Sequence, residues 1–136
     1  MGGLLFGAIM AAAGVLPLVA SLVGSDDAAV GFLVHMGFSG FIGGTFGILV
    51  AWARTRPSRS LAYGIAYGAV WWVLGGLTLM PLFLGMGVAY DTALTADGLG
   101  GLAGHLIYGV GLGATYGVLE TRAATKAPAE AKAPSP

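Results

Sequence analysis

The sequence predicts an all-α protein: a four-helix transmembrane bundle made of two parallel two-helix repeats. Of its 136 residues, 57% are hydrophobic and only 9% are charged, whereas a soluble domain carries about 25% charged residues. The charges cluster between four uncharged stretches, each long enough to cross the roughly 30 Å hydrocarbon layer as a helix of about 20 residues. A helix also satisfies every backbone hydrogen bond within its own segment, as lipid requires.

The four stretches set the expected domain organisation. We expect spans at Gly3–Val23, Ala28–Ala53, Ser60–Gly87 and Leu99–Leu119. The transmembrane domain then covers residues 1–120, with repeat one at about 3–53 and repeat two at about 60–119. Residues 121–136 are rich in Ala, Pro, Lys, Glu and Thr without an apolar period, which predicts a disordered tail.

Charge asymmetry between the loops predicts the orientation. Basic residues occur in the connection 54–59 and in the tail, whereas the other two connections contain Asp26, Asp27, Asp91 and Asp97 and no basic residue. The positive-inside rule places basic loops in the cytoplasm. We therefore expect a multi-pass protein of the cell inner (plasma) membrane with both termini cytoplasmic.

The two halves of the chain match each other. Residues 35–49 align with 105–119, so that His35 matches His105, Thr45 matches Thr115 and Phe46 matches Tyr116. The first helices of the halves align more weakly, through Phe6-Gly-Ala with Tyr67-Gly-Ala and Leu16-Pro-Leu with Met80-Pro-Leu. Two spans per half make the repeats parallel, related by a pseudo-two-fold axis along the membrane normal.

Small residues follow the matched helices at intervals of four. Such a ridge lets two helix backbones approach closely in lipid. We expect the second and fourth helices to pack together through Ser39, Gly43, Gly47, Gly109, Gly113 and Gly117.

The two histidines are the main candidate site, because an ionisable residue inside a membrane is a functional hypothesis by default. Three interpretations stay open for His35 and His105: hydrogen bonds that only hold the bundle together, a shared metal or bis-imidazole haem site, and a titrating gate. A macrocycle needs the helices held apart, whereas a glycine ridge lets them close.

Four further residues are candidates for lining a pocket. Trp71 and Trp72 lie near the middle of the third span, and Thr45 and Thr115 are matched between the repeats. Interhelical or lipid-facing filling is the more common role of such indoles. Pro17 and Pro81 are expected to bend the first and third helices, because proline removes a backbone donor.

The sequence favours a function without catalysis. The spans contain no carboxylate, the chain contains no cysteine, and no basic patch suggests nucleic acid. No dedicated cofactor or metal site is predicted. We expect a protein that packs laterally in the lipid bilayer, with itself or as a small accessory subunit of other membrane proteins. The alternatives are a small channel or transporter with the histidines near its outer mouth, and haem, metal or pigment binding by the histidine pair.

Two stretches carry a resemblance to known proteins: Tyr67-Gly-Ala-Val-Trp-Trp-Val-Leu-Gly-Gly-Leu-Thr-Leu-Met-Pro-Leu and Gly104-His-Leu-Ile-Tyr-Gly-Val-Gly-Leu-Gly-Ala-Thr-Tyr-Gly. They make the chain resemble small prokaryotic four-span membrane proteins of unknown function, and it is loosely similar to the YagU-type inner-membrane proteins. The resemblance covers about half the chain and implies location and topology, but no reaction.

Overall fold

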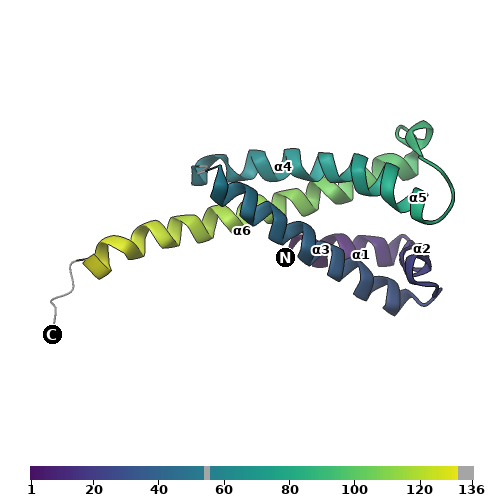
Figure 1. Ribbon diagram of the computed structural model, residues 1–136, viewed down its shortest axis with the longest axis horizontal. Helices are drawn as coiled ribbons and strands as arrows, with labels where there is room; N and C mark the ends of the chain where they lie inside the picture. The colour runs from purple at the N-terminus through teal and green to yellow at the C-terminus, as the bar shows by residue number, and fades with distance from the viewer. Residues whose placement is uncertain (54–55, 132–136) are drawn as a thin grey trace.

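The computed structural model describes residues 1–53 and 56–131, and helices are the regular secondary structure of this part of the chain (Figure 1). Its α-helices are α1 (Gly2–Ala12), α2 (Leu16–Ala20), α3 (Ala28–Trp52), α4 (Ser60–Trp71), α5 (Met80–Phe83) and α6 (Ala96–Ala131). Short 3-10 turns form η1 (Ser21–Val23), η2 (Pro57–Arg59) and η4 (Tyr90–Thr92). A π-helix, η3 (Trp72–Leu79), joins α4 to α5.

Three helical stretches are long and apolar enough to cross a membrane: Ala28–Trp52, Ser60–Phe83 and Ala96–Ala123. Their outer faces are apolar too, with Leu33 and Ile48 each 70% exposed. Exposed apolar surface on this scale is unfavourable in water but suits lipid. The prediction of a helical membrane protein is confirmed at this level.

The first predicted span, Gly3–Val23, is not one helix. It is divided into Gly2–Ala12 and Leu16–Val23, which are bent by 113° to each other. Gly14 takes the left-handed conformation, with φ at 69°. Its N–H bonds to the carbonyl of Ala11, and the N–H of Val15 bonds to that of Met10, which is the Schellman ending of a helix.

Pro17 therefore does not kink a continuous helix as the sequence analysis expected. It is the second residue of α2, where its missing N–H has no partner to lose. The bend comes from Gly14 instead, because glycine adopts a left-handed conformation without the steric cost that other residues pay.

The third span stays continuous from Ser60 to Phe83. A bend was expected at Pro81; the helix before it contains η3 instead, in which the N–H of Met80 bonds to the carbonyl of Gly75, five residues earlier. The helix ends in a second Schellman pattern, because Gly85 has φ at 72° and the N–H of Met86 bonds to the carbonyl of Pro81.

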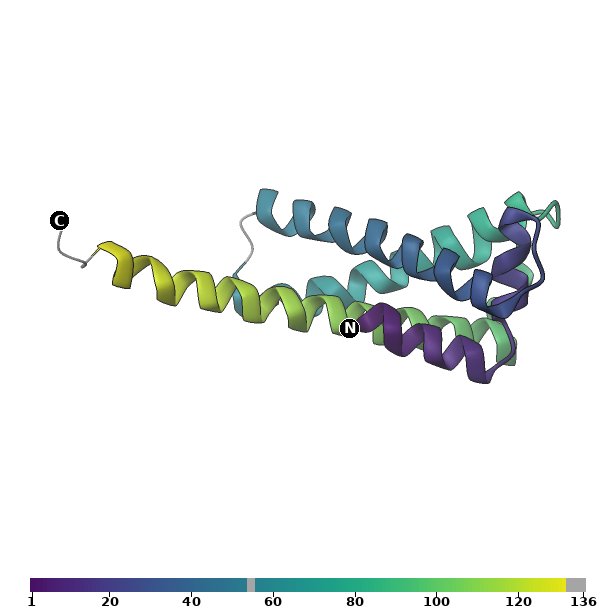
Figure 2. The same cartoon turned by 90° about the horizontal axis from the view of Figure 1, so that it is seen from below.

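The helices are arranged unevenly around α6. In Figures 1 and 2, α4 and α6 run side by side, and α1 lies along the N-terminal half of α6. The backbones of α4 and α6 approach each other closely: a methyl group on Gly64 would collide with Gly109 and Gly113. By contrast, α3 makes few close backbone contacts with either α4 or α6.

This arrangement corrects the expected glycine contact between the second and fourth helices. Gly109 and Gly113 pack on α4, whereas Gly43 and Gly47 of α3 face the side chains of Tyr108 and Tyr116. Tyrosine rings therefore separate the two helices, and Gly43 and Gly47 leave room for rings instead of a neighbouring backbone.

The two ends of the chain differ from the expected topology in detail. Gly2 packs against Gly111, so α1 begins beside the middle of α6 (Figure 2), and a cytoplasmic N-terminus stays a prediction. At the other end, α6 continues to Ala131, past the expected limit at Leu119. Alanines after Thr121 favour helix. Arg54 and the last five residues of the predicted tail, 132–136, lie outside the described part.

Candidate functional site

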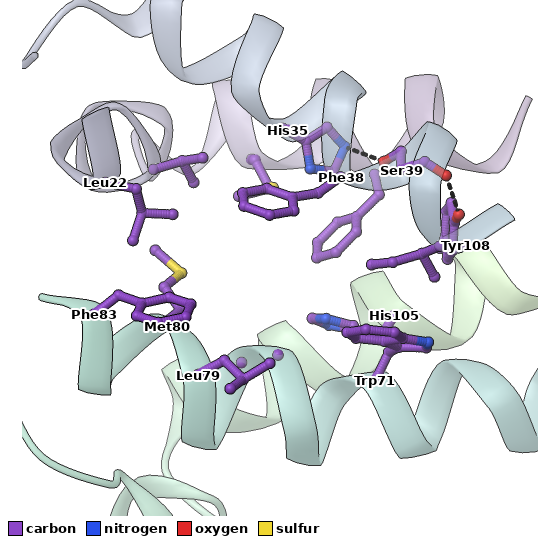
Figure 3. A pocket seen from close by; sticks show the side chains of 16 residues that line it. Leu22, His35, Phe38, Ser39, Trp71, Leu79, Met80, Phe83, His105 and Tyr108 are labelled. Carbon is purple, nitrogen blue, oxygen red and sulfur yellow. Dashed lines mark hydrogen bonds between the residues drawn. The ribbon is translucent and has the colours of Figure 1, made fainter. Parts of the chain in front are cut away.

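A cavity of about 160 Å³ lies between α3 and the η3–α5 stretch, and α1, α2 and α6 also contribute to its wall. Both histidines line it. Figure 3 shows His35, from α3, and His105, from α6, on opposite sides of the space. The chain thus brings its two intramembrane imidazoles, which are 70 positions apart in the sequence, to one site.

His35 is held in place by backbone of the first helix. Asp27 caps α3 by accepting hydrogen bonds from the N–H groups of Ala29 and Val30, and His35 follows two turns later, 8% exposed. Its Nε2 lies 2.9 Å from the carbonyl oxygen of Gly3. A carbonyl only accepts, so Nε2 carries the proton, and in the neutral ring Nδ1 keeps a lone pair.

His105 is oriented by its own helix. Its Nδ1 lies 2.8 Å from the carbonyl oxygen of Gly101, one turn earlier in α6. Nδ1 therefore donates, and Nε2 of the neutral ring keeps the lone pair. The ring also lies over Gly76 of the π-helix, where a methyl group would be 3.6 Å from Cε1.

The second nitrogen of each imidazole is open to a ligand. Neither His35 Nδ1 nor His105 Nε2 has a hydrogen-bond partner among the residues that the structure describes. Within the same residues, no fully buried side-chain nitrogen or oxygen lacks a partner. Both nitrogens must therefore be accessible, because neither is sealed inside the protein.

Phe6 separates the two imidazoles. Its ring centroid lies 5.4 Å from that of His35 and 4.9 Å from that of His105, both in edge-on geometry. Gly104 makes room for the phenyl ring, since a methyl group there would overlap it. The two imidazoles therefore lie on either side of the Phe6 ring, which separates them.

The remaining wall of the cavity is apolar and largely aromatic. Aromatic rings from several helices contribute to it. Figure 3 shows thioether and leucine side chains at the end near Phe83. The set includes Phe38, Trp71, Phe83, Leu22, Leu79 and Met80. Ser39 adds a hydroxyl 3.3 Å from His35 Nε2. The site is thus an apolar pocket with a few placed polar atoms, the usual make-up of a small-molecule site.

Three tyrosine hydroxyls bond to one turn of α3 at the end of the cavity that is nearer the basic connection. Tyr108 donates to the carbonyl of Ser39 (2.5 Å) and Tyr116 to that of Gly43 (3.2 Å). Tyr67 lies 3.1 Å from the carbonyl of Ile42 and 2.6 Å from the hydroxyl of Thr45. These rings hold α3 away from α4 and α6, and so create the width that the cavity uses.

The sequence analysis missed the π-helix that forms one wall of the cavity. Gly75 and Gly76 of η3 both line the space, and Thr78 donates to the carbonyl of Val73, five residues earlier. π-Helical turns occur often at functional sites. The Gly-Gly pair before a proline was the available sequence signal.

The other candidate residues have mixed positions. Trp71 lines the cavity, whereas Trp72 donates from Nε1 to the carbonyl of Gly98 in α6. Thr45 bonds to Tyr67 below the cavity, and Thr115 is exposed and bonds to the carbonyl of Gly111. The matched threonines therefore do not form a common site.

The described residues contain no cluster of three or more His, Asp or Glu side chains that could hold a metal ion. Two imidazoles on either side of a phenyl ring are also a poor start for a bis-histidine haem site. A cavity of about 150 Å³ accommodates benzene, and a haem macrocycle is several times larger.

Comparison with known proteins identified no relative. No family model, no curated protein and no solved structure matches the chain. The similarity to YagU-type proteins therefore stays an expectation from the sequence, and function is argued from the geometry of the cavity.

Proposed function

We propose that this chain is a non-catalytic membrane protein that binds a small, mainly apolar molecule in the cavity lined by His35 and His105. One observation carries the proposal: an apolar cavity inside the helical bundle receives an accessible lone pair from each imidazole. Such a void is uncommon in a well-packed interior, and an apolar cavity with a few polar atoms is the usual form of a small-molecule site.

The geometry disfavours a nucleophilic role for Ser39 and His35. A catalytic base must accept the hydroxyl proton, but the nitrogen nearest the Ser39 hydroxyl is the one that donates to Gly3. A pore receives little support for a different reason. Tyr67, Tyr108 and Tyr116 bond to α3 on the side of the cavity toward the basic end, where a pore would have to continue.

We place the cavity in a bundle of two parallel repeats, and aligned contacts support this. A methyl group on Gly7 would meet the side chain of His35, and one on Gly68 would meet the backbone of His105. One turn earlier, Gly3 faces Ser39 as Gly64 faces Gly109. Aligned residues therefore pair in the same way in both halves. The basic connection faces the cytoplasm of the inner membrane in this proposal.

The test uses a ring-shaped probe with a heavy atom. Para-bromophenol, titrated into protein in lipid nanodiscs, is expected to quench Trp71 fluorescence in a saturable way. In Trp71→Phe the saturable part should disappear, while Trp52, 84% exposed, still reports simple partition into lipid.

A matched pair of variants locates the binding. Gly75→Leu fills the cavity, and its first side-chain carbon has room, 3.6 Å from the nearest atom of Trp71. Gly100→Leu adds the same bulk on α6 where nothing lies within 4 Å. We expect saturable binding to be lost in Gly75→Leu and kept in Gly100→Leu. Equal binding by both variants, or linear quenching in the unaltered protein, refutes the proposal.

Lateral association with a second copy is the second candidate, and one face of α3 favours it. Gly37, Gly40 and Gly44 are exposed, and nothing in the chain lies within 4 Å of a methyl group built on any of them. Small residues four apart promote close helix pairing in lipid. Energy transfer between labelled copies in dilute nanodiscs or vesicles should fall in Gly40→Leu and persist in Gly100→Leu. A monomer under both conditions counts against self-association, and capture of a different membrane protein by the same face would make the chain an accessory subunit.

A further inference from the structure

We infer that the cavity selects a one-ring ligand that carries a hydroxyl donor, a phenol or hydroquinone head, over rings without a donor. The inference rests on the proposed binding function and adds the chemical class of the ligand. It follows from which nitrogen of each imidazole is already used, and from the size and lining of the space between them.

The imidazole nitrogens left to a ligand are acceptors. The N–H of His35 donates to the carbonyl of Gly3, and the N–H of His105 donates to the carbonyl of Gly101. In the neutral form of each ring, the other nitrogen keeps a lone pair. Both rings therefore present an unprotonated nitrogen, which bonds to a donor and repels the lone pairs of an ether or a quinone oxygen.

Among the residues that the structure describes, no side-chain donor bonds to either of these nitrogens. The nearby hydroxyl of Ser39 lies beside Nε2 of His35, on the side of the ring away from Nδ1. The hydroxyl of Tyr108 is engaged with the carbonyl of Ser39. The indole N–H of Trp72 is engaged with the carbonyl of Gly98. A donor group on a ligand can consequently bond to either nitrogen.

The apolar surroundings favour an aromatic ring as the ligand's body. Phe6, Phe38 and Trp71 face the same space from three different helices, and aromatic rings pack well edge-on or offset against one another. The volume of about 160 Å³ matches a single ring, since a cavity of about 150 Å³ binds benzene. A fused polycyclic body is too large for the space as it stands.

Three para-substituted bromobenzenes of similar size test the inference. They are para-bromophenol, para-bromoanisole and para-bromotoluene, which supply a donor, an acceptor and neither. After correction for partition into lipid, we expect the phenol to bind about tenfold more tightly than the other two, the effect of one net hydrogen bond of roughly 1.4 kcal/mol. The preference should fall to within about twofold in His35→Phe/His105→Phe.

A spectroscopic measurement needs no substitution. The chain has two histidines, so protein labelled with nitrogen isotope in histidine alone gives a few resolvable signals. Para-bromophenol should shift the signal of at least one unprotonated ring nitrogen, and para-bromoanisole should shift neither. This result stands even where the double variant does not fold.

The outcomes separate the inference from the proposed function. If all three probes bind saturably with equal affinity, or if the phenol preference survives in the double variant, the donor selection is wrong and the binding function stands. An unshifted histidine spectrum under saturating phenol also refutes donor selection. If no probe binds saturably, the proposed binding function itself fails.

Discussion

Gly64 of α4 and Gly109 of α6 face each other so closely that a methyl group on either one would collide with the carbonyl oxygen of the other. The contact is reciprocal, and it continues one turn along, where Gly68 meets the backbone of His105. Close backbone packing of this kind associates helices in lipid, where no hydrophobic force drives them together. It also fixes the depth and rotation of α6, and thereby the direction in which His105 enters the cavity.

Gly109→Ala should therefore destabilise the bundle by about 1–3 kcal/mol, the usual cost of overpacking a tight contact. Gly100→Ala is the matched control, because it lies on the same helix with nothing within 4 Å. Unfolding in mixed micelles, followed by circular dichroism, measures both. Equal stability of the two variants would show that α4 and α6 do not meet at this glycine.

Gly14→Ala distinguishes a broken first helix from a continuous one by the sign of its effect on the free energy of unfolding. With φ at 69°, an alanine at this position pays about 1 kcal/mol or more for the left-handed conformation. In a continuous helix the same change would stabilise the protein by about 1 kcal/mol. Gly37→Ala, at an open position within α3, supplies the helical reference. A stabilised Gly14→Ala would restore a single first span.

The sequence was sufficient for the helical membrane class, because uncharged stretches of this length have few other structures. It was insufficient for the break at residue 14, because Pro17 suggested the bend whereas Gly14 causes it. Proline is tolerated in the first turn of a helix, whereas a glycine three residues earlier supplies the left-handed ending. Hydropathy does not distinguish a straight span from two short helices at an angle.

The π-helix and the tyrosine bonds were beyond sequence reasoning for a different reason. Pro81 lies thirteen residues after Gly68, but its counterpart Pro17 lies ten after Gly7, and only the structure shows where the longer stretch is accommodated. Similarly, aligned Phe38 and Tyr108 differ by one hydroxyl. That hydroxyl finds its carbonyl acceptor, Ser39, in the other half of the chain, a pairing that depends on the distance between helices.

Tyr108→Phe should cost about 1 kcal/mol, within the range of interhelical hydrogen bonds measured in membranes. It removes the hydroxyl that donates to Ser39 and keeps the ring that separates α3 from α6. Tyr63→Phe removes a hydroxyl from a tyrosine that is 46% exposed, and its effect should stay within about 0.5 kcal/mol. Thermal unfolding in detergent compares the two, and a larger loss in Tyr63→Phe would contradict the tyrosine contacts described for α3.

The absence of cysteine from the chain makes its orientation directly measurable by single-cysteine labelling. Ser58 lies at the basic end, beside Arg56 and Arg59, whereas Leu94 is 84% exposed at the acidic end, in the connection that contains Asp91. Because basic loops stay in the cytoplasm, Leu94→Cys should react with a membrane-impermeant maleimide added to intact spheroplasts. Ser58→Cys should react only after the membrane is permeabilised, and labelling of both after permeabilisation controls for accessibility. The opposite pattern would invert the proposed topology and move the cavity, which lies nearer the acidic end, to the cytoplasmic half of the membrane.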